Sequence, residues 1–259
     1  MSIPATTTIA VHRPGPRAWL NLVVCEAKMV ARDTAGLVVP LGLPLLILLT
    51  SAPSAGDQVV VNGFSALEAY VLPLVLTMVL ATIGVINMPS FLAYYRRTGI
   101  LRRLSVTPAS PAMVLVAQVV VSVLQALLGL GLALAVAFLA FGARPPAHLA
   151  TAVGVYVLAM AAMYAVGMIV AAVAPTPNSA VAIGLVGFFA LGAVGGMFGG
   201  LAGLPEPVAA VGERLPFGAA VRALAASWVG APVEPAHLIS LGVTIVVGSM
   251  TAALLFRWD

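Results

Sequence analysis

Long apolar runs, separated by short polar breaks, dominate the chain. Six of them have roughly 17 residues or more, enough to cross the ~30 Å hydrocarbon core of a bilayer as helices. They cover residues 35–51, 67–94, 112–141, 149–174, 179–204 and 237–256. Because an open strand edge in lipid would leave backbone groups without hydrogen bonds, each run is predicted to be a helix. We therefore expect an all-α integral membrane protein with six spans.

Residues 16–33 follow a different pattern, with apolar and polar positions separated at helical spacing. The apolar face carries Leu20, Val23, Ala27 and Val30, and another face carries Arg17, Asn21, Lys28 and Arg32. This pattern predicts an amphipathic helix along the membrane interface, with its tryptophan at headgroup depth. Such a helix is either a plain anchor or a lever that joins a cytosolic partner to the first span. The residues assigned to it are Arg17, Trp19, Glu26, Lys28 and Arg32.

The break between the second and third spans, residues 95–111, is unusually basic. Only 8% of the chain is charged, yet four of its 12 Lys and Arg residues lie between Arg96 and Arg103. Gly99 permits a tight turn, and Pro108 ends a short amphipathic turn because the residue before a proline resists the helical conformation. This short helix would transmit a push between two long helices, or it would bind anionic lipid.

The distribution of positive charge predicts the orientation in the membrane. Nine of the 12 Lys and Arg residues fall on one side of the predicted spans and three, Arg144, Arg214 and Arg222, on the other. Since basic loops stay in the cytoplasm, we expect both termini and the 95–111 loop to be cytoplasmic.

Glycines and prolines mark two further features. Small residues spaced by four allow helices to approach closely, which predicts tight packing within the chain or against a second copy. The alternative role of such glycines is flexibility at a gate. The glycines with this spacing in the fifth span are Gly192, Gly195, Gly196, Gly199, Gly200 and Gly203. The proline-rich segment 205–236 is long for a loop, so we expect it to contain a helix that lies on or dips into the outer leaflet.

Few polar side chains lie inside the spans. Asn87, Gln118 and Gln125 are the candidates, and the two glutamines share a helix face because they are seven residues apart. They would bond to a neighbouring helix or line a pathway. We expect no metal ligands and no catalytic residues, since HExxH and GxSxG motifs are absent and the histidines, His12, His148 and His237, lie in the tail and at span ends.

Composition excludes most other classes of protein. The chain is 62% hydrophobic, so 20 charged residues cannot make a water-soluble surface for its 259 residues. Its basic excess fits membrane orientation, and no nucleic-acid partner is expected. No phosphate-binding GxxxxGK[ST] loop occurs, so the chain is expected to carry no ATP site and no cofactor of its own.

The amphipathic segment with EAKMVARD, the RRTGILRRLSVTPAS loop, the six spans and the long outer segment together resemble one family. The chain is similar to the membrane subunit of type-2 ATP-binding-cassette exporters, in particular the actinobacterial drug and antibiotic exporter permeases. The loop residues that match best are Arg96, Gly99, Leu101, Arg102, Thr107 and Pro108.

This resemblance implies a single transmembrane domain over residues 1–259 of a permease in the bacterial inner membrane. It implies a dimer, with itself or a sibling permease, on which two copies of a separate ATPase bind ATP and Mg. The 95–111 loop would be the coupling helix, through Arg96, Gly99, Ile100, Leu101, Arg102, Arg103, Leu104, Thr107 and Pro108, and residues 16–33 a second contact. Residues 205–236 would form short re-entrant helices, and the glycines of span five would pack near the dimer axis.

Two alternatives compete with an exporter permease. A secondary transporter or channel predicts a membrane-embedded acid or base or a broken-helix repeat, and neither is clear in the sequence. An intramembrane enzyme lacks a plausible catalytic set. An apolar pathway would suit lipids, amphipathic drugs or antibiotics, and the sequence does not identify the substrate.

Overall fold

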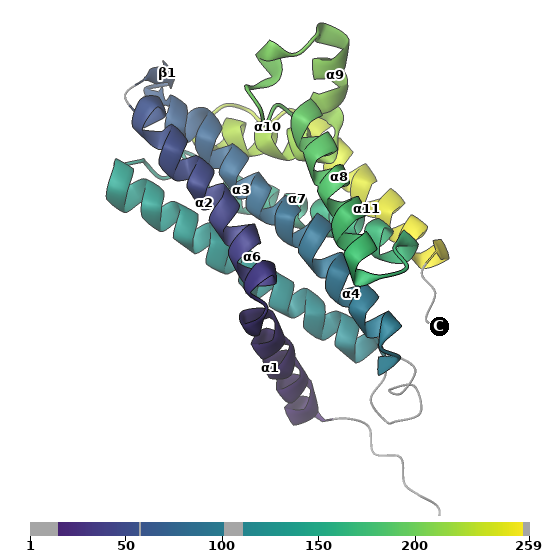
Figure 1. Cartoon of the computed structure of the whole chain (residues 1–259). Helices are drawn as coiled ribbons and strands as arrows, with labels where there is room; N and C mark the ends of the chain where they lie inside the picture. The colour runs from purple at the N-terminus through teal and green to yellow at the C-terminus, as the bar shows by residue number, and fades with distance from the viewer. Residues whose placement is uncertain (1–14, 57, 101–110, 256–259) are drawn as a thin grey trace, which may run out of the picture.

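The structure, a computed structural model, describes residues 15–56, 58–100 and 111–255, which fold almost entirely into helices (Figure 1). The α-helices are α1 (Pro16–Arg32), α2 (Thr34–Gly56), α3 (Leu72–Ala81), α4 (Met88–Arg97), α6 (Pro111–Phe141), α7 (Leu149–Val173), α8 (Pro177–Val194), α9 (Glu206–Arg214), α10 (Pro216–Val229) and α11 (Pro235–Leu255). Two π-helical segments, η1 (Leu67–Val71) and η2 (Thr82–Asn87), and a 3-10 turn, η3 (Leu201–Gly203), complete the helices.

Six helical segments in the described part of the chain are long and apolar enough to cross a membrane, which confirms the predicted number. Their bounds are Gly36–Gly56, Leu67–Arg97, Met113–Phe141, Leu149–Val173, Pro177–Val194 and Pro235–Leu255. The amphipathic helix predicted before the first span is present as α1, and α10 lies in the 205–236 segment where a helix is expected.

The second span, Leu67–Arg97, is the centre of the bundle. Of its most apolar window, 78% is buried, against 17–50% for the other five spans. It consists of η1, α3, η2 and α4 in succession, and Figure 1 shows these segments as one blue rod between the two ends of the molecule.

Two prolines explain why this central span is not a uniform α-helix. Pro73 and Pro89 each stand two residues beyond the end of a π-helical segment. A proline ring collides with the carbonyl four residues earlier and removes that carbonyl's usual donor. The wider π turn moves this carbonyl, of Ala69 or Val85, away from the ring.

Glycines of the fourth and fifth spans lie against the backbone of η2. A Cβ added to Gly167 would stand 1.8 Å from the Gly84 carbonyl oxygen, and one added to Gly184 would stand 2.5 Å from the Val85 carbonyl oxygen. Only residues without a Cβ allow helix backbones to approach so closely. Spans two, four and five therefore cross at η2.

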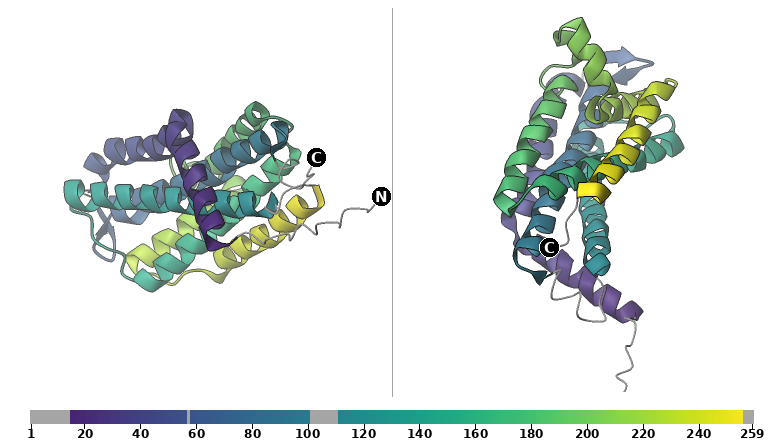
Figure 2. Two further views of the ribbon diagram at one scale, coloured as in Figure 1. Left: turned by 90° about the horizontal axis from the view of Figure 1, so that it is seen from below. Right: turned by 90° about the vertical axis from the view of Figure 1, so that its right-hand side faces the viewer.

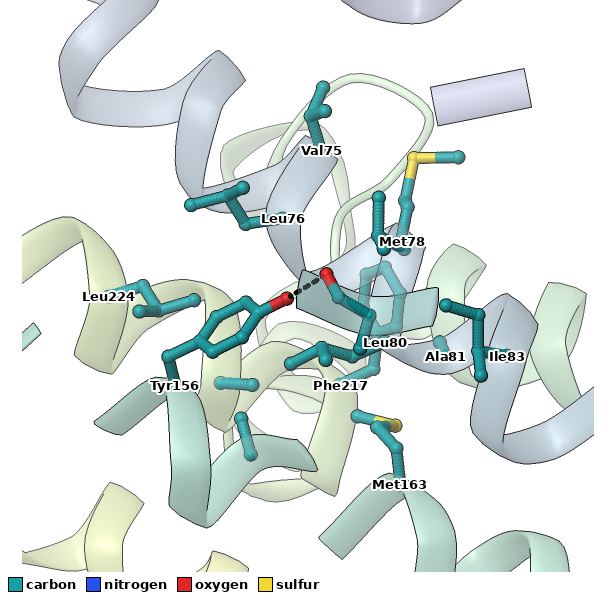
Figure 3. Close-up of a cluster of buried hydrophobic side chains, with 14 of the residues drawn as sticks. Val75, Leu76, Met78, Leu80, Ala81, Ile83, Tyr156, Met163, Phe217 and Leu224 are labelled. Carbon is teal, nitrogen blue, oxygen red and sulfur yellow. Dashed lines mark hydrogen bonds between the residues drawn. The ribbon is translucent and has the colours of Figure 1, made fainter. Parts of the chain in front are cut away.

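Apolar side chains from α3, α7 and α10 fill the space around the central span (Figure 3). Leu80 belongs to the same buried cluster as Met163 of α7 and Phe217 of α10. The hydroxyl of Tyr156 donates a 3.0 Å hydrogen bond to the Ala126 carbonyl, which gives this buried group a partner and joins α7 to α6.

A short hairpin precedes the central span. Strands β1 (Val59–Val61) and β2 (Phe64–Ser65) are antiparallel and form a two-stranded sheet, with Val59 paired to Ser65. Asn62 and Gly63, between them, both have positive φ, 50° and 77°, as a type I′ turn requires. Hydropathy predicts only a loop between the first two spans, residues 52–66, although the Asn-Gly pair within it is a hairpin signal.

The hairpin, the loop 142–148, α9 and α10 lie together at one end of the bundle, called here the hairpin end (Figures 1 and 2). Glu68, 3% exposed, accepts hydrogen bonds from the backbone N–H groups of Arg144 at 2.6 Å and Ser65 at 2.7 Å. The Arg144 carbonyl in turn accepts a 3.1 Å bond from Trp228 Nε1. This network joins β2, the central span, the 142–148 loop and α10.

The fifth span is shorter than predicted, since α8 ends at Val194 rather than near residue 204. Gly196, Gly199 and Gly200 have positive φ, which a right-handed helix does not allow. The apolar sequence continues beyond the helix, and composition alone does not reveal the change of backbone conformation.

The six glycines of this region consequently do not form two rows on one helix. Ideal Cβ atoms on Gly192, Gly195 and Gly196 would meet side-chain or backbone atoms of this same chain at 2.8–2.9 Å. Gly199, Gly200 and Gly203 have nothing within 4 Å of such an atom. The first three pack within the chain, and packing of the region near a dimer axis stays a prediction.

We predict that Gly167→Ala destabilises the fold, because its methyl group would overlap the Gly84 carbonyl. Forced overpacking costs about 1–3 kcal/mol. Thermal unfolding of the purified protein in detergent measures the loss. Gly154→Ala on the same helix is the matched control, since nothing lies within 4 Å of its added Cβ. Equal midpoints for the two variants would contradict the crossing at η2.

Candidate functional site

The opposite end of the bundle, called here the arginine-rich end, is built from α1, the last turn of α4 and the loop 174–176. Figure 2 shows α1 at this end, far from the hairpin. It carries the exposed side chains of Arg17, Lys28, Arg32 and Arg97.

Helix α1 packs on the second and third spans through its apolar face. Val30 is buried in a cluster with Phe91 and Tyr95 of α4 and with Val114 and Val121 of α6. The helix begins with Pro16 at a position where its missing N–H costs nothing. Its apolar residues at helical spacing therefore pack it against the other helices, and its position along the membrane interface stays a prediction.

A buried carboxyl group strengthens this contact. Glu26, 6% exposed, accepts a hydrogen bond from the hydroxyl of Tyr95 at the end of α4. Tyr95 Oη also lies 3.5 Å from Met29 Sδ. Burial raises the pKa of the Glu26 carboxyl above its usual 4.5, and the Tyr95 hydrogen bond opposes that rise only in part.

The junction between α1 and α2 is tied to two spans by one backbone carbonyl. Asp33 Oδ1 accepts a 3.1 Å bond from the Gly36 N–H and so caps the start of α2. The Gly36 carbonyl accepts bonds from Asn87 Nδ2 at 2.9 Å and Gln125 Nε2 at 2.7 Å. Asn87 Nδ2 also lies 3.0 Å from Gln125 Oε1. Asn87 and Gln125 thus bond helix to helix.

Gln118 differs from Gln125, which lies two turns further along the same face of α6. It is 1% exposed, and its Oε1 has no hydrogen-bond partner among the described residues. It lines a cavity of about 220 Å³ together with Met88, Leu92 and Met168. Of the three polar candidates in the spans, Gln118 is the one whose amide oxygen has no partner among the described residues.

The end of α4 is also joined to the loop between α7 and α8. Arg96 Nη2 donates a hydrogen bond to the Ala174 carbonyl, at the C-terminus of α7, where a positive charge is favourable. Ala93, Ala174 and Ala180 pack beneath this contact. Thr176 and Ser179 then form a capping box that starts α8.

The structure describes only the beginning of the predicted coupling segment. Gly99 has φ of +68°, as the predicted turn after α4 requires, and Ile100 packs against the α1 cluster. The remaining residues assigned to coupling lie outside the described residues: Leu101, Arg102, Arg103, Leu104, Thr107 and Pro108. Of the residues assigned to the interfacial helix, Trp19 is half-buried and Glu26 alone is fully buried.

The stretch from Ala93 to Ile100 is therefore a mechanical junction. It contacts α1 through Tyr95, the cluster around Val30 through Ile100, and the loop 174–176 through Ala93 and Arg96. A force on the predicted coupling segment after Ile100 would therefore reach α1, the central span and the connection between α7 and α8. Tyr95, Gly36 and Asp33 are not among the predicted site residues, although the position of Asp33 before a helical run is an N-cap signal.

Comparison with known proteins gives one family. The family model described as ABC-2 type transporter matches residues 20–229. A search of curated proteins finds no match to the chain.

The Gly36 network makes a first prediction for this end. Gln125→Leu removes two interhelical hydrogen bonds, at about 0.6–1.7 kcal/mol each in membranes, and we expect it to lower the thermal midpoint. Gln118→Leu is the matched control on the same face and should leave the midpoint unchanged or raised, because its Oε1 is unpartnered. If both variants unfold at the same temperature, the network contributes nothing.

Docking of α1 is predicted to depend on pH. Because the folded-state pKa of Glu26 is raised, its stabilising contribution is complete below 4.5 and is lost as pH rises through the folded-state pKa. Cys25, exposed and the single cysteine, accepts a nitroxide label that reports the mobility of α1. Mobility should increase with pH in the parent protein and stay constant in Glu26→Gln.

The control is Glu206→Gln, which changes an exposed carboxylate on α9 at the other end. This variant should keep the parent pH dependence of the Cys25 label. A Glu26→Gln protein with that same dependence would show that another group controls the docking of α1.

Proposed function

Since the chain belongs to the ABC-2 type transporter family and is thus the permease subunit of an ATP-binding-cassette exporter, we propose that a separate ATPase subunit drives it. The chain moves a hydrophobic or amphipathic substrate, such as a drug, antibiotic or lipid, out of the cell across the bacterial inner membrane. It resembles the actinobacterial drug and antibiotic exporters in its coupling-loop residues. The observation that carries the proposal is the mechanical junction at Ala93–Ile100.

The coupling segment follows directly from this junction. Residues 101–108 dock on the ATPase, and α1 makes a second contact beside them. A movement of the ATPase then pulls on Tyr95 and Arg96, which hold α1 and the end of α7. ATP and Mg bind to the ATPase, since this chain contains no phosphate-binding loop.

Charge supports the orientation that coupling requires. The arginine-rich end and the coupling loop hold most of the basic residues, so this end and both termini face the cytoplasm. The hairpin end then faces outward. Residues 205–236, with α9 and α10, form its outer segment of short helices.

Two permeases, identical or siblings, form the translocation route with two ATPase copies. Gly199 and Gly200, two of the glycines with no atom within 4 Å of an added Cβ, line a cavity of about 500 Å³ near the hairpin end. Its wall combines apolar Leu74 and Met197 with the hydroxyl of Tyr70 and the cation of Arg222. Such a wall suits an amphipathic molecule better than a small ion.

The test is to isolate the tagged chain from its native membrane in mild detergent and to identify the proteins that accompany it. We expect a stoichiometric ATPase with a phosphate-binding loop. Leu101→Glu combined with Leu104→Glu should lose this ATPase while the chain still inserts in the membrane. The loss follows because a charge would occupy the apolar face of the coupling helix.

Val59→Glu, which alters an exposed side chain in the hairpin at the other end, is the matched control and should retain the ATPase. A chain that purifies alone, under conditions that preserve known complexes, would favour a secondary transporter or channel. Gln118 would then be the first pathway residue to test.

A further inference from the structure

Four polar side chains meet at the hairpin end, away from the arginine-rich end. Glu213 stands in the last turn of α9, Glu234 directly before α11, His237 in the first turn of α11 and Arg222 on α10. His237 Nε2 lies 3.3 Å from Glu213 Oε1 and 3.8 Å from Glu234 Oε2. The possible ligand atoms of Glu213, Glu234 and His237 all lie within 4.8 Å of one another.

The histidine is the unusual member of this cluster. Its side chain is 8% exposed, and Nδ1 has no hydrogen-bond partner among the described residues. Buried polar groups in native proteins are nearly always paired, so an unpaired one calls for an explanation. Without a metal, the carboxylates beside Nε2 favour a proton on that nitrogen, whereas a dication held between them would take its lone pair and leave the proton on Nδ1.

We propose that Glu213, Glu234 and His237 bind a divalent transition-metal ion of the zinc type. In a tetrahedral site with bonds of about 2.0–2.1 Å, ligand atoms stand about 3.3 Å apart. The separation of 3.3 Å between His237 Nε2 and Glu213 Oε1 matches that edge, and 3.8 Å to Glu234 Oε2 needs only a small side-chain shift.

The donor set decides the class of metal. One imidazole nitrogen with two carboxylate oxygens suits zinc and its neighbours, whereas calcium requires six to eight oxygens and magnesium an octahedron of oxygens. A cavity of about 330 Å³, lined by all three ligand residues and Tyr70, leaves space for entry and for a water as the fourth ligand.

Arg222 competes with the metal for one ligand. Its Nε lies 3.2 Å from Glu213 Oε1, the same oxygen that faces His237. Because the arginine side chain is 45% exposed, it can leave this oxygen for solvent when a dication arrives. Removal of the arginine charge should therefore tighten metal binding, which an ordinary ion-pair cluster would not predict.

Metal binding would connect α9 to the start of α11. These elements already touch through a hydrogen bond from Ser240 Oγ to the Arg214 carbonyl. The proposal departs from the expectation that His237 has no metal role, because the sequence gives no sign that residue 213 meets residues 234–237. It is independent of the ATPase and of the substrate.

The experiment uses the full chain, purified with a tag that contains no histidine and stripped with a chelator. Titration calorimetry and thermal unfolding with ZnCl₂ should show one ion per chain and a higher midpoint, and CaCl₂ and MgCl₂ should have no such effect. His237→Ala should weaken zinc binding by more than the 10–100-fold typical for loss of an outer-shell partner. Arg222→Gln should bind zinc more tightly than the parent protein.

His148→Ala is the matched control, since His148 also lies at the hairpin end but outside the cluster, and it should bind zinc as the parent does. If His237→Ala does not fold, Glu234→Gln serves as the test variant instead. The Glu234 side chain is 62% exposed, and glutamine has nearly the same shape as glutamate. A parent protein without a zinc-dependent shift would overturn the proposal. So would a Glu234→Gln protein that binds zinc as tightly as the parent.

Discussion

The burial of the second span within the bundle is the constraint on which the rest of the structure depends. A central helix in a membrane must satisfy its own backbone, yet Pro73 and Pro89 each remove one donor from it. The π turns relieve the clash, and the backbone of η2 then lies at the surface of the rod. Gly167 and Gly184 allow the fourth and fifth spans to cover it directly. The crossing of three helices at η2 is therefore explained by Pro89 in one of them and by the glycines in the other two.

The two ends of this rod are held in different ways. At the hairpin end, Glu68 and Arg144 join four separate segments through charged and backbone hydrogen bonds. At the arginine-rich end, α4 packs on α7 and α8, and the Tyr95–Glu26 and Arg96–Ala174 bonds join it to α1 and to the end of α7. A force that enters at this end would therefore reach several helices through α4.

Length and hydropathy were enough to predict the six spans, because a helix in lipid needs about 20 apolar residues whatever surrounds it. The same rule overextended the fifth span, since Gly196, Gly199 and Gly200 are apolar but adopt backbone conformations outside the helix. The helical spacing of apolar positions predicted α1. The Asn62-Gly63 hairpin was predictable from local sequence and was missed. The Glu213–His237 contact was not predictable, because it depends on how α9 packs beside α11.

The polar side chains within the spans bear on which source of energy can drive transport. Asn87, Gln125 and Tyr156 are neutral, and each hydrogen-bonds to a backbone carbonyl of another helix. The ionisable side chains of the span ends, Glu68 and Arg96, are already engaged in bonds that hold helices together. A proton or ion relay needs acids or bases spaced across the membrane, and the apolar middle of these spans contains no Asp, Glu, Lys, Arg or His. Work delivered mechanically to the helix ends needs no such residues, and this favours an external ATPase over an ion gradient as the source of energy.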